Sequence, residues 1–501
     1  MNRFLALGSL LLAAMPLASR ASPPPDFSPL AALIQQTKEA TALPSGTAIA
    51  VIKNGKVVYE GYFGYSDIGA RTPVTRDTVF YIASATKPFF ALNALLQEDG
   101  GQLDMRMSLH DMFPEGRFTG IDANAVTVKD LLVHTSGVDN QPLVWATAYS
   151  GIHDARSLRG LVSASYPDEK AARGTFKYTN VGYNILSVWL DAHGLVSWQE
   201  QLERNVLHPL DMQRTSTSVD KARAAGWTLA KPYSFASAQP RQPLYIAKSD
   251  ATMHAAGGLV STAPDLAKFL IAELASGRRQ AIPTKVIHRS HEPQVALVAK
   301  YMDFPRTGYA WGWYTGEYKG RTMLHHFGGF AGFHAHLSFM PDEGIALVVL
   351  NNEDVLGAQL TSLITDYVYG SLLGEPDVAS TVSRRFDALR TKAAEVSRMA
   401  ARQRETIQAR AWALSRPRTE YAGRYSNELL GDMTVHVDED RGMVIRWGNV
   451  QAVATGGEAP DRVRVEFAPN SGDFLDFRTE NGAVTAISFE QMVFKKSPGE
   501  G

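Results

Sequence analysis

The chain of 501 residues contains no cysteine. This absence excludes disulfides, thiolate nucleophiles, iron–sulfur clusters and cysteine-based zinc sites, so any covalent nucleophile must be an oxygen or an amine. An excess of one charge is also missing, because 50 lysines and arginines face 51 aspartates and glutamates. Without a basic excess there is no electrostatic footprint for nucleic acid or for an anionic membrane. A chain of this length builds a core that requires neither disulfide nor metal for stability.

Apolar runs long enough to cross a bilayer as a stable anchor are missing as well. The apolar run Phe4–Met15 follows a positive charge at Arg3 and precedes the small residues of Ser19-Arg20-Ala21. This pattern is typical of a cleaved export signal, and we expect residues 1–21 to be a signal peptide. The alternative is a buried N-terminal helix. A cysteine-free exported protein is expected in a bacterial periplasm or outside the cell, with no membrane attachment after cleavage.

Strand patterns occur near both ends of the first 380 residues, with helical patterns between them. Asn54-Gly55 separates two β-rich runs within Gly46–Tyr65 and predicts a hairpin. The apolar run Ile345–Leu350 predicts a strand buried on both faces. Helical patterns dominate from Pro88 to about Leu274. This order predicts an α+β fold, in which early and late strands form one sheet that carries a helical insertion.

The last quarter of the chain differs in texture. Residues 381–416 are rich in Ala, Arg and Glu, which favours a solvated helical linker. After Arg416-Pro417-Arg418, short alternating runs are separated by turn residues, a pattern that predicts a small antiparallel β-barrel over residues 417–497. We therefore expect a mixed helix-and-sheet domain over residues 22–380, then the linker, then the barrel.

Ser84 and Lys87 are the first candidates for chemistry. They lie one helical turn apart, after the apolar stretch Phe80–Ala83 and before the apolar helix pattern Phe89–Leu96. A lysine buried beside a serine can lose its charge by desolvation and then deprotonate the hydroxyl.

Tyr178 and Asn180 form a second candidate element, at the start of the apolar stretch Val181–Leu186. A phenol near serine and lysine can relay protons, and an amide can hold both a lysine and a substrate carbonyl. Taken alone, Tyr178 fits a core aromatic residue better than a catalyst.

Both spacings occur twice in the chain. Ser218 and Lys221 repeat the serine–lysine spacing in a polar segment that has no apolar flanks. Tyr425-Ser426-Asn427 repeats the tyrosine–asparagine spacing inside the predicted barrel. The spacing alone is therefore a weak signal.

His326, Gly328 and Gly329 form a third element. Glycines at the lip of an edge strand let a substrate approach and pair with the backbone. A free N–H there, together with that of Ser84, could form an oxyanion hole. The competing interpretation is a metal site, since twelve residues hold four histidines: His325, His326, His334 and His336. No HExxH motif occurs and no carboxylate lies at ligand spacing, so we expect structural roles for His334 and His336 and neither metal nor cofactor.

In this order along the chain, the three elements resemble the active-site motifs of the class C β-lactamase and penicillin-binding-protein superfamily: Ser84-x-x-Lys87, Tyr178-x-Asn180 and His326-x-Gly328. Three more stretches resemble other hallmark segments of that family: Thr127–Gly137, Gly257–Phe269 and Gly328–Phe333. The resemblance covers residues 28–375. It implies a β-lactamase/transpeptidase-like sheet flanked by helices, a helical domain inserted into it, and a site between the two.

The resemblance also implies acyl transfer. Ser84 would attack a carbonyl, and Lys87 and Tyr178 would share the proton transfers. Asn180, His326, Gly328 and Gly329 would bind the substrate. The backbone N–H groups of Ser84 and Gly329 would stabilise the oxyanion, and water would release the acyl group. His134, Thr135 and Ser136, in the first hallmark segment, are expected to be structural.

One departure from the family pattern matters for specificity. β-Lactamases and transpeptidases carry Lys-Thr-Gly where this chain has His326-Phe327-Gly328, so the cation and hydroxyl that grip a substrate carboxylate are gone from the motif. His-x-Gly resembles the D-aminopeptidases and some esterases of the superfamily. The region from Tyr421 onward resembles the lipocalin-like domain appended to such enzymes.

We therefore expect an exported serine hydrolase that forms a Ser84 acyl-enzyme. Its substrate would be a small peptide or ester, with peptidoglycan fragments as one source, in the manner of a D-aminopeptidase, a carboxypeptidase or an esterase. The alternatives are a β-lactamase, a non-catalytic sensor that binds peptidoglycan fragments or β-lactams, and a metal-dependent amidohydrolase.

Overall fold

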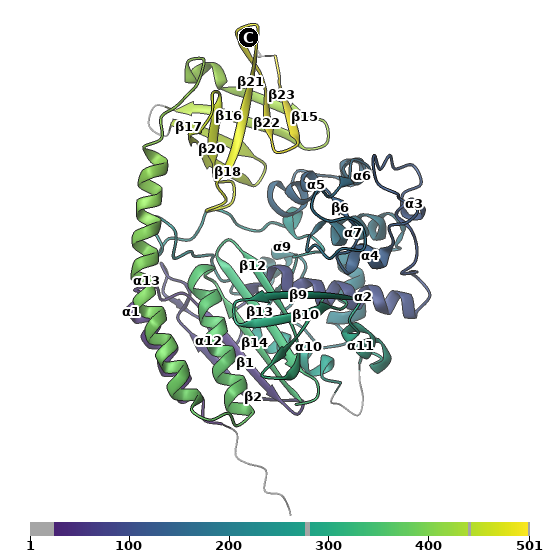
Figure 1. Cartoon of the computed structure of the whole chain (residues 1–501), viewed down its shortest axis with the longest axis vertical. Coiled ribbons are helices and arrows are strands. Elements are labelled where there is room, and N and C mark those ends of the chain that lie inside the picture. Colours follow the sequence, from purple (N-terminus) through teal and green to yellow (C-terminus); the bar gives the residue numbers. More distant parts are fainter. Residues whose placement is uncertain (1–24, 276–280, 439–441, 499–501) are drawn as a thin grey trace, which may run out of the picture.

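The computed structural model describes residues 25–275, 281–438 and 442–498. The signal peptide predicted over residues 1–21 lies outside this part of the chain. Figure 1 shows a sheet covered by helices, a helical insertion beside it, and a barrel-like sheet at the far end of the long helix α13. Within the described ranges, no helix is both long and apolar enough to span a bilayer.

One antiparallel sheet of eight strands, in the order β2-β1-β14-β13-β12-β11-β10-β9, forms the centre of the main part. Its strands are β1 (Thr47–Lys53), β2 (Lys56–Phe63), β9 (Val295–Tyr301), β10 (Phe304–Tyr309), β11 (Tyr314–Tyr318), β12 (Arg321–Phe330), β13 (Phe333–Met340) and β14 (Ile345–Asn351). The predicted hairpin is β1–β2, and Asn54 and Gly55 at its turn have φ of 51° and 72°. β1 also pairs with β14, so early and late strands share one sheet, as predicted.

Alternate side chains of the central strands serve two cores. In β1, Ala48, Ala50 and Ile52 join the core that contains α2 and α10, whereas Ile49 and Val51 join the core that contains α1, α12 and α13. The strand predicted to be buried on both faces is β14, and all of its residues are buried. The helices concerned are α1 (Ser28–Ala40), α2 (Lys87–Asp99), α10 (Ala263–Glu273), α11 (Thr284–His291), α12 (Val355–Leu372) and α13 (Val378–Gln408).

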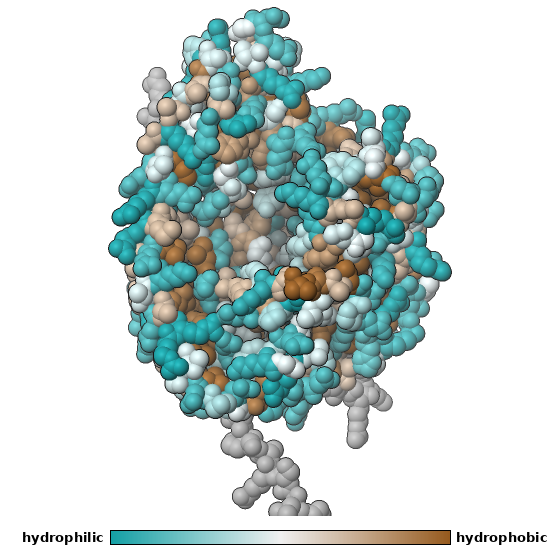
Figure 2. Space-filling model, viewed as in Figure 1, coloured by the Kyte–Doolittle hydropathy of each residue, from teal (hydrophilic) through white to brown (hydrophobic). Residues whose placement is uncertain are grey.

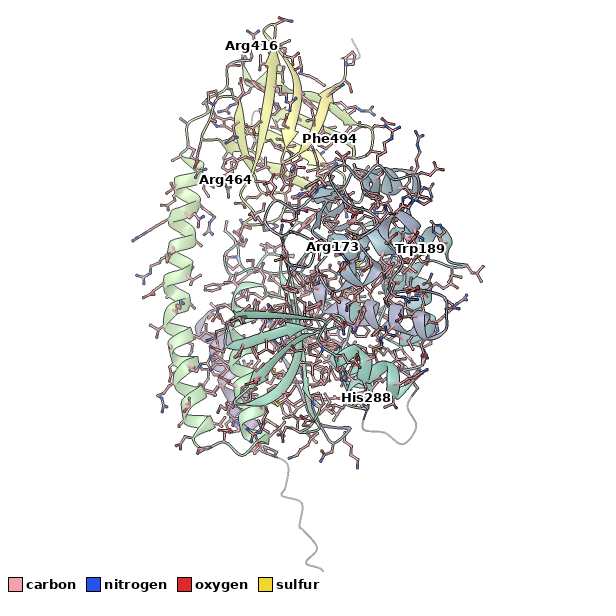
Figure 3. The ribbon with its side chains drawn as sticks, turned by 45° about the vertical axis from the view of Figure 1, so that its right-hand side comes forward. Arg173, Trp189, His288, Arg416, Arg464 and Phe494 are labelled. Atoms are coloured by element: carbon pink, nitrogen blue, oxygen red, sulfur yellow. The ribbon has the colours of Figure 1, made fainter. Side chains whose placement is uncertain are left out.

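The helical insertion lies between β5 (Phe80–Tyr81) and β8 (Val260–Ser261), two short strands that pair with each other. Its α-helices are α3 (Leu109–Met112), α4 (Val128–Leu132), α5 (Gln141–Trp145), α6 (Ala155–Ser163), α7 (Val181–His193), α8 (Trp198–Leu202) and α9 (Val219–Ala224). Figure 3 marks the three parts by labelled side chains: Trp189 in the insertion, His288 of α11 beside the sheet, and Phe494 in the C-terminal sheet.

The C-terminal part is a nine-stranded antiparallel sheet in the order β18-β17-β16-β15-β23-β22-β21-β20-β19. Its two edge strands are separated along the chain by Ala454 alone, so the sheet nearly closes into the predicted barrel. The strands are β15 (Gly423–Asn427), β16 (Gly431–Asp438), β17 (Gly442–Trp447), β18 (Val450–Val453), β19 (Thr455–Gly456), β20 (Arg462–Val465), β21 (Asp473–Glu480), β22 (Ala483–Phe489) and β23 (Met492–Lys496).

Helix α13 differs from the solvated linker predicted over residues 381–416. It begins three residues earlier, at Val378, and ends eight residues earlier, at Gln408. Val382, Phe386 and Leu389 on its first half are buried in the same core as α1 and α12. The first half is therefore part of the main domain, and the second half extends to the barrel (Figure 1).

The barrel is attached to the helical insertion by an aromatic contact. The ring of Trp145 lies 4.9 Å from that of Phe489 and 5.9 Å from that of Trp447, centroid to centroid. The backbone N–H of Asn449 donates a 2.8 Å hydrogen bond to the carbonyl of Ser150 in the same insertion. Figure 2 shows a hollow on one face of the molecule, between the barrel, α13 and the sheet.

Candidate active site

Ser84 and Lys87 lie at the start of α2, on the face of the sheet opposite α12. Ser84 belongs to a 3-10 turn, η1 (Ala83–Thr86), and the α-helix itself begins at Lys87. The Lys87 Nζ lies 3.2 Å from the Ser84 Oγ. Ser84 is partly exposed and Lys87 is fully buried. The Ser84 hydroxyl is therefore accessible to solvent, whereas the Lys87 amine beside it is buried.

Lys87 is held by neutral acceptors. Its Nζ donates to the Oδ1 of Asn180 at 2.8 Å and to the carbonyl oxygen of Ala256 at 2.9 Å. Burial lowers the pKa of Lys87 well below its ordinary value, and no neighbouring carboxylate within the described chain opposes that shift. With two N–H groups donated, the lone pair of the neutral amine is left for the Ser84 hydroxyl, which is the arrangement a general base requires.

Tyr178 lies against the same pair. The Lys87 Nζ is 4.6 Å from the centroid of the Tyr178 ring. Burial raises the pKa of Tyr178 well above its ordinary value, although a hydrogen bond with Ser84 opposes the shift. The phenol therefore keeps its proton at neutral pH and can donate it.

His134 positions the Tyr178–Asn180 loop. Its ring lies 4.6 Å from that of Tyr178, its Nδ1 accepts from the backbone N–H of Thr179 at 3.4 Å, and its Nε2 lies 3.2 Å from the hydroxyl of Tyr309. Burial lowers the pKa of His134 well below its ordinary value, so the ring is neutral and can hold both bonds in one tautomer. These contacts agree with the structural role predicted for His134.

The third element lies at the end of β12. This strand pairs with β13 up to Phe330 but with β11 only up to His325, so residues 326–330 have no β11 partner. β12 is therefore not the edge strand that we predicted. It is an interior strand with an open last segment, because the antiparallel β11 begins only at Tyr314, opposite His325.

The two glycines of this segment differ in their surroundings. A Cβ on Gly328 would lie 1.8 Å from the carbonyl oxygen of Ile82, just before the Ser84 turn. Only glycine lets β12 approach that turn so closely. A Cβ on the exposed Gly329 would meet nothing within 4 Å, so the strand surface there is open to a substrate.

His326, the first residue of the third element, is buried and carries no charge. Its ring lies 5.9 Å from that of Tyr178, and its Nδ1 lies 2.8 Å from the carbonyl of Phe327. Its Nε2 is buried without a hydrogen-bond partner in the described chain. Burial lowers the pKa of His326 well below its ordinary value, and the Arg306 guanidinium and, when it is protonated, the Lys87 amine lower it further. The motif therefore supplies a neutral ring where the β-lactamases have a cation.

The remaining histidines do not converge on one point. The Nδ1 of His334 lies 3.2 Å from Thr361 of α12, and the Nε2 of His336 lies 2.7 Å from Ser338. His325 is fully buried. Over the described ranges, no three His, Asp or Glu side chains form a group that could hold a metal ion. The contacts of His334 and His336 agree with the structural roles predicted for them.

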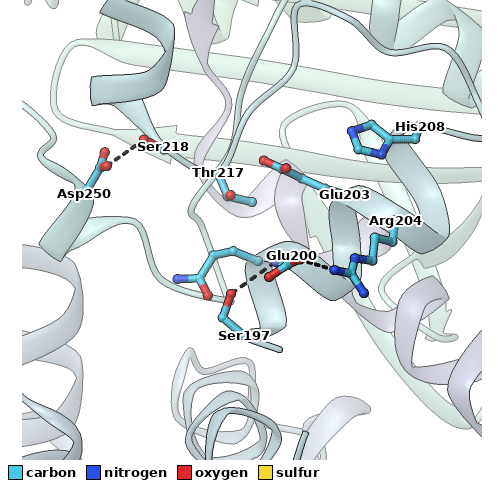
Figure 4. Close-up of a pocket in the computed structure, with 9 residues that line it drawn as sticks. Ser197, Glu200, Glu203, Arg204, His208, Thr217, Ser218 and Asp250 are labelled. Atoms are coloured by element: carbon cyan, nitrogen blue, oxygen red, sulfur yellow. Dashed lines mark hydrogen bonds and ion pairs between the residues drawn. The ribbon is translucent and has the colours of Figure 1, made fainter. Parts of the chain in front are cut away.

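The second serine that precedes a lysine by three residues has a different environment. Ser218 caps α9, donates to Asp250 at 2.6 Å and lines a separate pocket of about 420 Å³ (Figure 4). The Lys221 Nζ is paired with Glu203 at 2.9 Å. An amine held by a carboxylate is a poor partner for deprotonating a hydroxyl. Tyr425, which repeats the tyrosine–asparagine spacing, is buried inside the barrel.

Sequence reasoning did not identify two contributors to the site. Ala256, whose carbonyl accepts a hydrogen bond from Lys87, directly precedes the Gly257–Phe269 segment. That motif therefore indicated this part of the chain. Arg306 of β10 influences the pKa of both Tyr178 and His326. No motif singles it out, because β10 reaches the site only through the pairing of the sheet.

Comparisons with known proteins agree with this geometry. The beta-lactamase family model matches residues 30–364. An unguisins hydrolase, ungD', of Aspergillus campestris is 26% identical over 433 residues, which cover 83% of this chain and 78% of that protein. Penicillin-binding protein 4* of Bacillus subtilis is 27% identical over 180 residues, 34% of this chain and 37% of that protein.

Two solved structures share the fold. The octameric penicillin-binding protein homologue of Pyrococcus abyssi has a TM-score of 0.60 and 22% identity, covering 94% of this chain and 100% of that one. The D-alanine carboxypeptidase AmpC of Burkholderia cenocepacia has a TM-score of 0.53 and 22% identity, covering 69% of this chain and 97% of that one. With its fold and its hydrolase relatives, the chain belongs to the beta-lactamase family and is a serine hydrolase.

Proposed function

We propose that this protein cleaves small peptide amides or esters through an acyl-enzyme on Ser84. The observation that supports this most directly is the contact between the partly exposed Ser84 and the buried Lys87, whose partners are neutral. Burial among neutral acceptors favours the uncharged amine, which can take the hydroxyl proton.

The pKa directions assign the two proton-transfer roles. Lys87, whose pKa is lowered, accepts the proton of Ser84 as the Oγ–carbonyl bond forms. Tyr178, whose pKa is raised, keeps its proton and gives it to the leaving nitrogen or oxygen as that bond breaks. The proton on Lys87 then restores the phenol. A water molecule attacks the acyl-enzyme, and its proton follows the same route back to Ser84.

Backbone and amide groups hold the reacting carbonyl in this proposal. The N–H groups of Ser84 and Gly329 receive the oxyanion, and the open segment of β12 pairs with the substrate backbone. The amide nitrogen of Asn180 orients the acyl part, because its oxygen is already used by Lys87. His326 lies beside Tyr178, and Gly328 lets β12 approach the Ser84 turn.

The proposed substrate class follows from the lack of charge on His326 in the third element. With His326 uncharged, the motif lacks the cation of the β-lactamases, so we place the activity with peptidases and esterases rather than with antibiotic resistance. The run Phe4–Met15 after Arg3 supports export, and we place the enzyme in a bacterial periplasm or outside the cell. A β-lactamase and a non-catalytic sensor remain the alternatives that the experiment must separate.

The test is the intact mass of the protein after reaction with a fluorophosphonate probe. We expect one adduct on the wild type and none on Ser84→Ala. Ser218→Ala is the matched control, because it removes the other serine of the same spacing, and it should be labelled like the wild type. A folded wild type without an adduct would favour the sensor. Loss of the adduct in Ser218→Ala would assign the nucleophile to Ser218 instead of Ser84. Nitrocefin turnover as the main activity would favour a β-lactamase.

A further inference from the structure

His254 begins a tight turn that supplies one of the two acceptors of Lys87. The backbone N–H of Gly257 donates a 2.9 Å hydrogen bond to the carbonyl of His254. The two alanines between them are therefore the corners of a β-turn. The second of these, Ala256, accepts the 2.9 Å hydrogen bond from the Lys87 Nζ. The direction of that carbonyl therefore depends on how the first residue of the turn is held.

Asn184 of helix α7 holds His254. The His254 Nδ1 lies 3.1 Å from the Asn184 Oδ1, and both side chains are buried. Asn184 lies one helical turn after Asn180, and its backbone N–H donates to the carbonyl of Asn180 at 3.2 Å. The Asn180 side chain is the other acceptor of Lys87, at 2.8 Å. The contact between His254 and Asn184 therefore joins the two elements that hold the buried amine.

The hydrogen bonds of Thr147 determine which nitrogen of His254 carries the proton. The Thr147 hydroxyl donates its single proton to the carbonyl of Leu143 at 2.7 Å, so it can only accept from the Asn184 Nδ2, at 2.9 Å. The Asn184 amide therefore turns its oxygen toward His254. Burial lowers the pKa of His254 well below its ordinary value, so the ring is neutral and has one N–H group. Because its partner is an oxygen acceptor, that N–H group is at Nδ1.

We propose that His254 is a positioning residue that fixes the direction of the Lys87 lone pair. Its hydrogen bond to Asn184 keeps the two acceptors of Lys87 in place relative to each other. With two positions of the amine fixed in this way, the third faces the Ser84 Oγ, 3.2 Å away. This inference rests on the proposed function, since it takes Lys87 as the base that deprotonates Ser84.

The test measures the rate of Ser84 labelling by the fluorophosphonate probe as a function of pH. His254→Leu removes the N–H group but keeps a side chain of similar size, and it should slow labelling about 10- to 100-fold. The loss should persist on the alkaline plateau, because the amine is misdirected and not protonated. His254→Asn places an amide N–H close to the position of Nδ1 and should recover most of the rate.

Two further variants localise the effect. Asn184→Leu should slow labelling by a similar factor, and the double variant with His254→Leu should be no slower, because both changes break the same hydrogen bond. His153→Leu is the matched control. The His153 Nε2 lies 2.7 Å from the carbonyl of Ala251, so this change removes an imidazole contact from the same segment without touching the partners of Lys87. It should be labelled like the wild type.

A second readout does not depend on labelling. Nitrogen NMR of isotope-labelled histidines, assigned with His254→Asn, should show His254 as the Nδ1–H tautomer. The Nε2–H tautomer would contradict the hydrogen bond to Asn184 and overturn the inference. If His254→Leu does not fold, this tautomer and the rate of Asn184→Leu decide the question.

Three labelling results would overturn the inference and leave Ser84 as the nucleophile: a normal rate in folded His254→Leu, a loss that disappears at alkaline pH, or no recovery in His254→Asn. A wild type that forms no adduct would instead overturn the proposed function, and this inference with it. A thermal melt of each variant accompanies the rates. A merely structural role of His254 would lower the melting temperature and leave the labelling rate of the folded protein unchanged.

Discussion

Gly328 lies where β12 touches the turn that carries the nucleophile. The position is set by a backbone contact, because the space for a side chain is filled by the carbonyl of Ile82. Gly329, the next residue, has open space at the same point. The two glycines are alike in sequence, and only the tertiary contact distinguishes them.

Gly328→Ala is therefore expected to separate β12 from the Ser84 turn. The added methyl group should cost about 1–3 kcal/mol of unfolding free energy, and the displaced oxyanion site should lower kcat/KM about 100-fold. Denaturant unfolding and turnover of a nitrophenyl ester measure the two effects. Gly329→Ala adds the same methyl group and should unfold like the wild type. Equal destabilisation by both variants would show that the contact with Ile82 is unimportant.

Helix α13 joins two parts of the molecule, and its two halves have different surroundings. Phe386 on the first half is completely buried, whereas Met399 on the second half is 69% exposed. Composition alone suggested one solvated helix, because its arginines and glutamates outnumber the few apolar residues that dock against α1 and α12. The apolar residues are nonetheless spaced to lie on one face.

Truncation of the two apolar residues should have unequal effects. Phe386→Ala removes a ring from the core and should lower the unfolding free energy by about 3–5 kcal/mol. Met399→Ala, the matched change at an exposed site of the same helix, should alter it by about 0.5 kcal/mol or less. Denaturant unfolding followed by tryptophan fluorescence measures both. Similar losses would show that the docking of α13 contributes little.

At the scale of the whole molecule, the buried histidines are expected to make the stability depend on acid. Burial lowers the pKa of six of them below the ordinary value of 6.5, and that of His334 falls to about 4. The others are His134, His254, His325, His326 and His336. Each ring is neutral in the folded chain and takes up a proton on unfolding, so acid favours the unfolded state.

The unfolding free energy should therefore be constant with respect to these groups above pH 6.5 and fall as the pH is lowered toward 4. Each histidine contributes a slope of up to about 1.4 kcal/mol per pH unit in that range. Urea unfolding at a series of pH values measures the slope. His334→Gln should reduce this slope, because it removes one of the buried rings. A flat profile between pH 6.5 and 4 would contradict the burial of these rings.

The sequence by itself determined the local part of this protein. Ser84 and Lys87 lie within one turn, the β1–β2 hairpin closes at Asn54-Gly55, and the barrel strands alternate, because each depends on neighbours a few residues apart. The tertiary structure decided which of two equal spacings became a site, since Lys87 is buried among neutral acceptors and Lys221 is paired with Glu203. It also decided the place of Arg306, the open segment of β12 and the docking of α13. These features depend on strand pairing and desolvation between residues that are distant in the chain, and local sequence patterns predict neither.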